Sequence, residues 1–128
     1  MTKEEIIQKG KTVVRIESEA ISGLLNTIGD EFASAVETIL ECKGRVVLTG
    51  MGKSGLIARK IVATLNSTGT AAIYLHPTDA LHGDLGMVRK EDVAILISKS
   101  GNTEEISTLI QLLKRLKVKL IGMCADRK

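Results

Sequence analysis

The first quarter of the chain carries apolar residues at the spacing of an amphipathic helix. Within residues 4–25 they recur at helical spacing, so they share one helix face. The members of this stripe are Ile6, Ile7, Val13, Val14, Ala20, Ile21, Leu24 and Leu25. The pattern predicts one long helix, and because its apolar face needs a partner surface, it also suggests self-association.

A second helix is predicted over residues 31–42. Gly29 interrupts the first pattern and Gly44 ends the second. The residues expected to face inward are Phe32, Val36, Ile39 and Leu40.

Beyond Gly44 the pattern changes to short apolar runs separated by helical stretches. Residues 45–49, 70–75, 93–98 and 119–123 are typical of buried parallel strands. Residues 53–67 and 103–117 have the length and spacing of crossover helices. The alternation predicts an α/β fold with a doubly wound parallel sheet of about four strands, preceded by two helices. Ligands bind beyond the carboxyl ends of such strands, at residues 50–55, 76–86 and 98–105.

Composition supports a single folded domain. The chain has 128 residues, of which 44% are hydrophobic and 26% charged, with one proline. Cys42 and Cys124 lie far apart and are expected to be two buried thiols. No stretch approaches the roughly 20 apolar residues of a membrane span, and the first ten residues are too charged for a signal-peptide core. We therefore expect a cytoplasmic protein without a membrane partner.

The charge pattern argues against nucleic acid. The net charge is +3, and the one dense basic cluster is Lys114, Arg115, Lys117 and Lys119. Single-strand binders stack bases on aromatic rings, but Phe32 and Tyr74 are the sole aromatic residues and neither lies among basic residues. Solvated lysines at a helix end explain the cluster better.

The first glycine loop, GMGKSG at residues 50–55, follows a strand and opens a helix, so its free amides form an anion site. The phosphate-binding loop of NTPases, GxxxxGK[ST], needs a glycine five residues before Gly52, but the chain has Val47 at that position. A dinucleotide site wants an acidic residue at the end of the next strand, where the chain has Leu75 and His76. An NTPase phosphate-binding loop is therefore disfavoured, and dinucleotide binding remains a weaker alternative to a simple anion site.

Lys53 strengthens the anion hypothesis. A cation at a helix N-terminus opposes the helix dipole and costs about 0.3 to 1 kcal/mol unless an anion is present. A lysine that points into solvent is the alternative.

The second loop, SKSGNTEE at residues 98–105, again joins a strand to a helix. It offers hydroxyls and free amides that suit a phosphate, from Ser98, Ser100, Gly101 and Thr103. Ordinary helix capping competes with this hypothesis, because Asn102 and Glu105 have capping-box spacing. For Glu105, capping and catalysis are equally compatible with the spacing.

The two histidines, His76 and His82, share one segment near the strand ends. Two histidines beside two anion sites suggest proton transfer or a metal role. Without a nearby cysteine they form an incomplete zinc site.

Taken together, four motifs resemble those of sugar isomerase (SIS) domains, and specifically the arabinose 5-phosphate isomerases. They are GMGKSG at 50–55, STGT at 67–70, LHP at 75–77 with HGDLGM at 82–87, and SKSGNTEE at 98–105. The resemblance implies interconversion of D-arabinose 5-phosphate and D-ribulose 5-phosphate, toward the Kdo sugar of lipopolysaccharide or capsule. It also implies a homo-oligomer, a tetramer in the family, and no organic cofactor.

The resemblance further implies roles for individual residues. Lys53, His82 and Glu105 match catalytic positions, for enediolate or phosphate stabilisation, ring opening and proton shuttling respectively. His76 matches a histidine that contacts zinc. Positions that match substrate or phosphate contacts are Ser54, Gly69, Thr70, Ser98, Ser100, Gly101 and Thr103.

Family members continue past the fourth strand, often into CBS domains, so the resemblance implies that these 128 residues correspond to part of the family's length. A phosphosugar sensor without catalysis and an inactive truncated isomerase remain as alternatives.

Overall fold

The computed structural model describes residues 1–101 and 103–125. The chain divides into two compact units, Met1–Val36 and Glu37–Lys128, and each is described by itself. That the whole chain acts as one domain stays a prediction.

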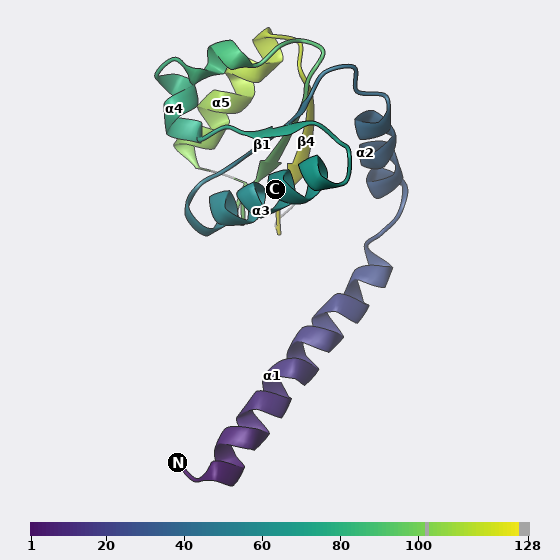
Figure 1. The fold of residues 1–128 in the computed structure, drawn as a ribbon, viewed down its shortest axis with the longest axis vertical. Helices are drawn as coiled ribbons and strands as arrows, with labels where there is room; N and C mark the ends of the chain where they lie inside the picture. Colours follow the sequence, from purple (N-terminus) through teal and green to yellow (C-terminus); the bar gives the residue numbers. More distant parts are fainter. Residues whose placement is uncertain (102, 126–128) are drawn as a thin grey trace. The chain divides into compact units, whose positions relative to one another are not determined.

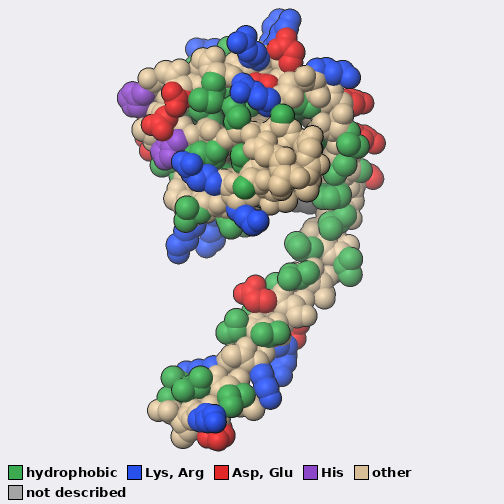
Figure 2. Space-filling model, in the orientation of Figure 1, with side chains coloured by type: hydrophobic (Ala, Val, Ile, Leu, Met, Phe, Trp, Pro, Cys, Tyr) green, Lys and Arg blue, Asp and Glu red, His purple; other side chains and the backbone are tan. Residues whose placement is uncertain are grey.

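The first unit consists mainly of the predicted long helix, α1 (Lys3–Gly23), which is followed by the 3₁₀ helix η1 (Leu24–Asn26). A capping box starts α1: Thr2 Oγ1 accepts from Glu5 N at 3.2 Å, and Glu5 Oε2 accepts from Thr2 N at 2.6 Å. No residue of α1 is buried, and its hydrophobic side chains reach the surface (Figure 2). The next helix, α2 (Asp30–Leu40), confirms the second predicted helix with slightly shifted ends. The prediction that its apolar residues face inward was wrong for Phe32, Val36 and Leu40, which are exposed.

The second unit is built on a parallel sheet. Its strands are β1 (Val46–Gly50), β2 (Ala72–Tyr74), β3 (Val93–Ile97) and β4 (Lys119–Met123), in the order β2-β1-β3-β4. This order confirms the doubly wound prediction. The predicted strand at 70–75 is shorter than expected, because Gly69 has a φ of 95° and Thr70 N still donates to Leu65 O at the end of a helix.

Helices cover both faces of the sheet (Figure 1). The helix α3 (Gly52–Ser67) packs on one face, where Ala58 meets Val46 and Leu48. The helices α4 (Pro77–Leu81) and α5 (Glu104–Arg115) cover the other, where Leu109 meets Val47. Alternate residues of β1 thus enter two different cores, which is why the strands read as continuous apolar runs.

Two parts of the second unit differ from the sequence prediction. Residues 76–86 were expected to be a loop but contain α4 and the start of η2 (Asp84–Met87). The signal was Pro77, which occupies the first turn of α4, where its missing N–H costs nothing. The prediction of two buried thiols was wrong, because Cys42 is half-buried and Cys124 is exposed just after the edge strand β4. No helix in the described ranges has both the length and the apolar character to cross a membrane.

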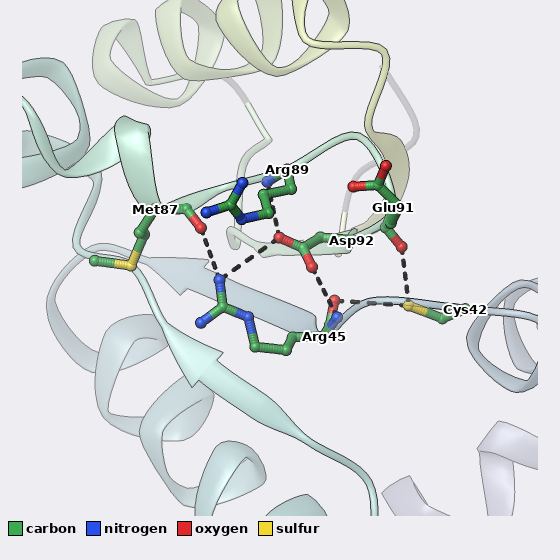
Figure 3. A network of polar contacts seen from close by, with 6 residues as sticks. All are labelled: Cys42, Arg45, Met87, Arg89, Glu91 and Asp92. Carbon is green, nitrogen blue, oxygen red and sulfur yellow. Dashed lines mark hydrogen bonds and ion pairs between the residues drawn. The ribbon is translucent and has the colours of Figure 1, made fainter.

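A polar network ties together the amino ends of β1 and β3 (Figure 3). The buried Asp92 carboxylate accepts from Arg45 N at 2.7 Å and from Arg89 N at 2.9 Å. The Arg45 guanidinium donates to the Met87 carbonyl at 2.7 Å, and Cys42 Sγ donates to the Glu91 carbonyl at 3.4 Å. A hollow of about 540 Å³ lies over this network, at the end of the sheet opposite to the glycine loops. Both oxygens of the buried Asp92 carboxylate accept hydrogen bonds from the protein. We therefore interpret the network as a structural clamp between the amino ends of β1 and β3.

Candidate functional site

A pocket of about 250 Å³ lies where the two predicted loops meet, at the carboxyl ends of the adjacent strands β1 and β3. We call it the carboxyl-end pocket. It is lined by Ser54, Ser98, Lys99, Ser100 and Thr103 among polar residues, and by Met51, Ile97 and Ile106 among apolar ones. The structure thus brings residues of both loops to one cavity, at the switch point where doubly wound folds bind ligands.

The second loop turns back on itself after β3. Ser98 is 8% exposed, and its Oγ accepts from Gly101 N at 3.0 Å. Gly101 has a φ of 70°, a conformation that favours glycine. The turn places Ser100 and Thr103 on the wall of the carboxyl-end pocket.

Thr103 carries an unusual hydroxyl. It is the N-cap of α5, with extended backbone angles, yet its side chain makes no capping hydrogen bond. Its Oγ1 is buried and has no hydrogen-bond partner in the described part of the chain. A buried hydroxyl without a partner is costly, and on a pocket wall beside a helix N-terminus it suits a ligand oxygen.

The start of α5 also corrects the capping-box alternative. Asn102 lies outside the described residues, and the N-cap is Thr103, so Glu105 is the second residue of the helix and Ile106 the third. A capping box needs the acidic residue at the third position. Glu105 is exposed in this first turn, where its charge still suits the helix dipole.

The first loop presents a positive helix N-terminus. Met51 is the N-cap of α3 and supplies no side-chain bond, and the first turn contains no acidic residue. Lys53 is exposed in that turn, and Ser54 lines the carboxyl-end pocket. Free amides and a cation together favour an anion, as the sequence predicts.

The two histidines lie at the two ends of α4. The N-cap is His76, whose Nδ1 accepts from Thr78 N at 3.2 Å, and the C-cap is His82, which is exposed. Both histidines reach the surface on one face of the second unit (Figure 2). The segments bearing Lys53, His82 and Glu105 follow β1, β2 and β3 respectively, so all three leave the carboxyl edge of the sheet.

The described residues do not by themselves form a zinc site. No group of three His, Cys, Asp or Glu side chains able to hold a metal occurs among residues 1–101 and 103–125. His76 Nδ1 accepts from Thr78 N, so Nε2 is the ring nitrogen that this contact leaves for another partner. The zinc hypothesis for His76 stays a prediction.

Gly69 and Thr70 lie elsewhere. They follow α3 and precede β2, at the amino end of the sheet, whereas the carboxyl-end pocket is at the opposite end. Within a single copy of the chain, Gly69 and Thr70 therefore do not reach the carboxyl-end pocket.

Sequence reasoning missed two residues that shape the first loop. Tyr74 Oη donates to the Gly50 carbonyl at 2.8 Å, and the Arg59 guanidinium lies 4.1 Å from the centre of the Tyr74 ring. The chain's one tyrosine, at the end of a predicted strand beside the first loop, was the available signal.

Fold and site together define an α/β protein with a pocket lined by hydroxyl groups at the switch point between its central strands. The chain belongs to the SIS domain family, which matches residues 39–128.

Characterised relatives are similar over most of the chain. It is 49% identical over 122 residues to the arabinose 5-phosphate isomerase KdsD of Pseudomonas aeruginosa, covering 95% of this chain and 37% of the relative. It is 53% identical over 114 residues to KdsD of Escherichia coli K12, covering 89% of this chain and 35% of the relative. The chain thus spans little more than a third of these relatives.

A solved structure shows the same fold. An Escherichia coli CFT073 protein in complex with arabinose 5-phosphate superimposes with a TM-score of 0.92 at 42% identity, over 98% of this chain and 67% of that one.

Proposed function

We propose that the chain carries the sugar-phosphate site of an aldose-ketose isomerase that interconverts D-arabinose 5-phosphate and D-ribulose 5-phosphate. The observation that carries the proposal is the buried, unpartnered Thr103 hydroxyl in a pocket between two helix N-termini of the described chain. The substrate comes from the relatives named arabinose 5-phosphate isomerase and from the similar structure in complex with that sugar phosphate. Synthesis of Kdo precursors in the cytoplasm is the setting we propose.

The phosphate accepts hydrogen bonds from the second loop, through the hydroxyls of Ser98, Ser100 and Thr103, with Ser54 on the facing wall. The Gly101 amide donates to Ser98 Oγ and so orients that hydroxyl. Such bonds to an anion are about twice as strong as neutral ones. Because serine and threonine hydroxyls donate along adjustable directions, they can follow the phosphate oxygens.

The reaction itself moves protons and needs no oxidant. His82 assists ring opening, and Glu105 removes the proton on C2 and returns a proton to C1. The C2 hydroxyl proton is lost as the C1 oxygen gains one, so an aldose becomes a ketose. Lys53 stabilises the negative charge of the enediolate. No step is assigned to zinc at His76.

A homo-oligomer completes the proposal. Gly69 and Thr70 lie at the opposite end of the sheet from the carboxyl-end pocket, so they contact substrate only from a second copy of the chain. The exposed apolar residues of α1, among them Ile6, Val13 and Ile21, offer a surface for such assembly.

Thr103→Val tests the phosphate site. Its hydroxyl has no partner among the described residues, so its removal should leave the free energy of unfolding within about 1 kcal/mol. Loss of one bond to a charged ligand should weaken arabinose 5-phosphate binding by about 10- to 100-fold. Calorimetric titration measures the affinity, and thermal unfolding measures the stability.

Thr108→Val is the matched control, because Thr108 is exposed on the same helix and should leave both quantities unchanged. Equal affinity of wild type and Thr103→Val would contradict the proposed site. Tighter binding of a nicotinamide dinucleotide than of arabinose 5-phosphate would contradict the proposed substrate class.

A further inference from the structure

Tyr74 supplies a hydrogen bond that the sheet cannot. Leu75 N donates to Leu48 O at 2.9 Å, so continued parallel pairing would bring the N–H of residue 77 to the Gly50 carbonyl. Residue 77 is proline, which has no N–H. The Tyr74 hydroxyl donates to that carbonyl instead, at 2.8 Å. The last carbonyl of β1 on this side is therefore satisfied by a side chain.

The same hydroxyl packs into the first turn of α3. A Cβ at Gly55 would lie 2.7 Å from Tyr74 Oη and 2.6 Å from Gly50 O, which is too close for any real Cβ. Glycine at position 55 thus lets the helix start, the strand end and the phenol meet. The third glycine of the GxGxxG pattern accommodates a tyrosine, which explains the pattern without a dinucleotide.

Two neighbours hold the Tyr74 ring. The Arg59 guanidinium lies over it at 4.1 Å, one helical turn beyond Gly55, and the His76 ring meets it edge-on at 6.4 Å. Burial raises the pKa of the Tyr74 hydroxyl, the charge of Arg59 opposes this, and Asp79 adds to it. The phenol stays protonated at neutral pH and remains a donor.

We propose that Tyr74, clamped by Arg59, is the positioning residue of the first glycine loop. Its hydroxyl fixes the end of β1 against the start of α3, and so sets the direction of the free amides of that turn and the place of Lys53. The loop geometry stands on the contacts alone, whereas the identity of the anion rests on the proposed function.

Tyr74→Phe removes the donor and keeps the ring. The Gly55 amide, which donates to Met51 O at 3.3 Å in the first turn of α3, reports on the loop. Its hydrogen exchange, followed by NMR without ligand, should accelerate about tenfold or more, as expected when a buried carbonyl loses its partner. Val118→Ala, a cavity in the other core near the amino end of β4, is the control for general loss of stability.

Exchange at Gly55 that rises no more in Tyr74→Phe than in Val118→Ala overturns the proposal. If Tyr74→Phe fails to fold, Arg59→Gln is measured in the same way, because it retains the hydroxyl but uncovers the ring; unchanged exchange at Gly55 is then the overturning result.

Titration with arabinose 5-phosphate adds the functional readout. In Tyr74→Phe the amide shifts of Lys53 and Ser54 on binding should shrink, whereas those of Ser98 and Thr103 persist. Equal responses in wild type and Tyr74→Phe at all four amides would overturn the positioning role. A wild-type chain that binds no arabinose 5-phosphate would defeat the proposed function, while exchange at Gly55 would still decide the role of Tyr74.

Discussion

Two hydroxyl groups at the carboxyl edge of the sheet differ in whether the protein supplies a hydrogen-bond partner. Tyr74 Oη has a protein acceptor at 2.8 Å, whereas the buried Thr103 Oγ1 has no partner within the described residues. Loss of the first should disturb the loop even without ligand. Loss of the second should be felt mainly when an anion is bound, because only then does the hydroxyl make its bond.

At the same scale, Arg59→Gln should change the ionisation of Tyr74. The Arg59 charge lowers a pKa that burial raises above the ordinary value of about 10. Removing that charge should therefore raise the pKa of Tyr74 further. Because the chain has one tyrosine and no tryptophan, absorbance titration reports this group alone. Arg59→Lys, which keeps the charge, should shift the pKa less, and a pKa that falls in Arg59→Gln would contradict the contact.

The direction of the Tyr74 pKa shift also determines how the free energy of unfolding depends on pH. A raised pKa means that the folded chain keeps its phenol neutral where the unfolded chain has begun to ionise. The contribution of the neutral Tyr74 phenol to the free energy of unfolding is fully present below about pH 10. It is lost as the pH rises through the pKa of Tyr74 in the folded chain.

At the scale of strands and helices, hydrophobic periodicity located every strand and four of the helices in the described chain, because each has an apolar face. The ends of these elements were less predictable. Thr70 was predicted to lie in a strand, but its amide donates to Leu65 O at the end of α3. The two glycine loops were recognisable from glycine and hydroxyl spacing. Tyr74 and Asp92 were not, because each acts on backbone groups that are distant in sequence and meet only in the folded sheet.

Asp92→Asn tests the clamp at the amino ends of β1 and β3. The carboxylate accepts from Arg45 N and Arg89 N through its two oxygens, and an amide has one oxygen, so one partly buried N–H loses its acceptor. The change should lower the free energy of unfolding by about 1 to 3 kcal/mol. Thermal unfolding should shift down by about 4 to 8 °C per kcal/mol.

The neighbouring Glu91→Gln is the control, because Glu91 is exposed and its carbonyl, not its carboxylate, joins the network. Its effect should stay within about 0.5 kcal/mol. Equal effects of the two substitutions would show that the clamp does not stabilise the fold.

At the scale of the whole molecule, the chain spans little more than a third of its curated relatives. It contains both glycine loops and the positions of Lys53, His82 and Glu105. In our proposal Gly69 and Thr70 serve the pocket of a second copy, because they lie at the opposite end of the sheet from the pocket of their own chain. In our proposal this chain therefore binds the sugar phosphate by itself, whereas turnover requires the assembled oligomer.

The most direct test is to follow arabinose 5-phosphate by NMR in deuterated water. It is applied to a chimaera in which this chain replaces the segment that it matches in the Pseudomonas aeruginosa relative, with binding to the 128-residue chain measured in parallel. We predict formation of ribulose 5-phosphate, lost by several orders of magnitude in Glu105→Gln while sugar-phosphate binding persists. Binding without any product or exchange at C2, or full turnover by Glu105→Gln, would contradict the assignment of an isomerase site to these residues.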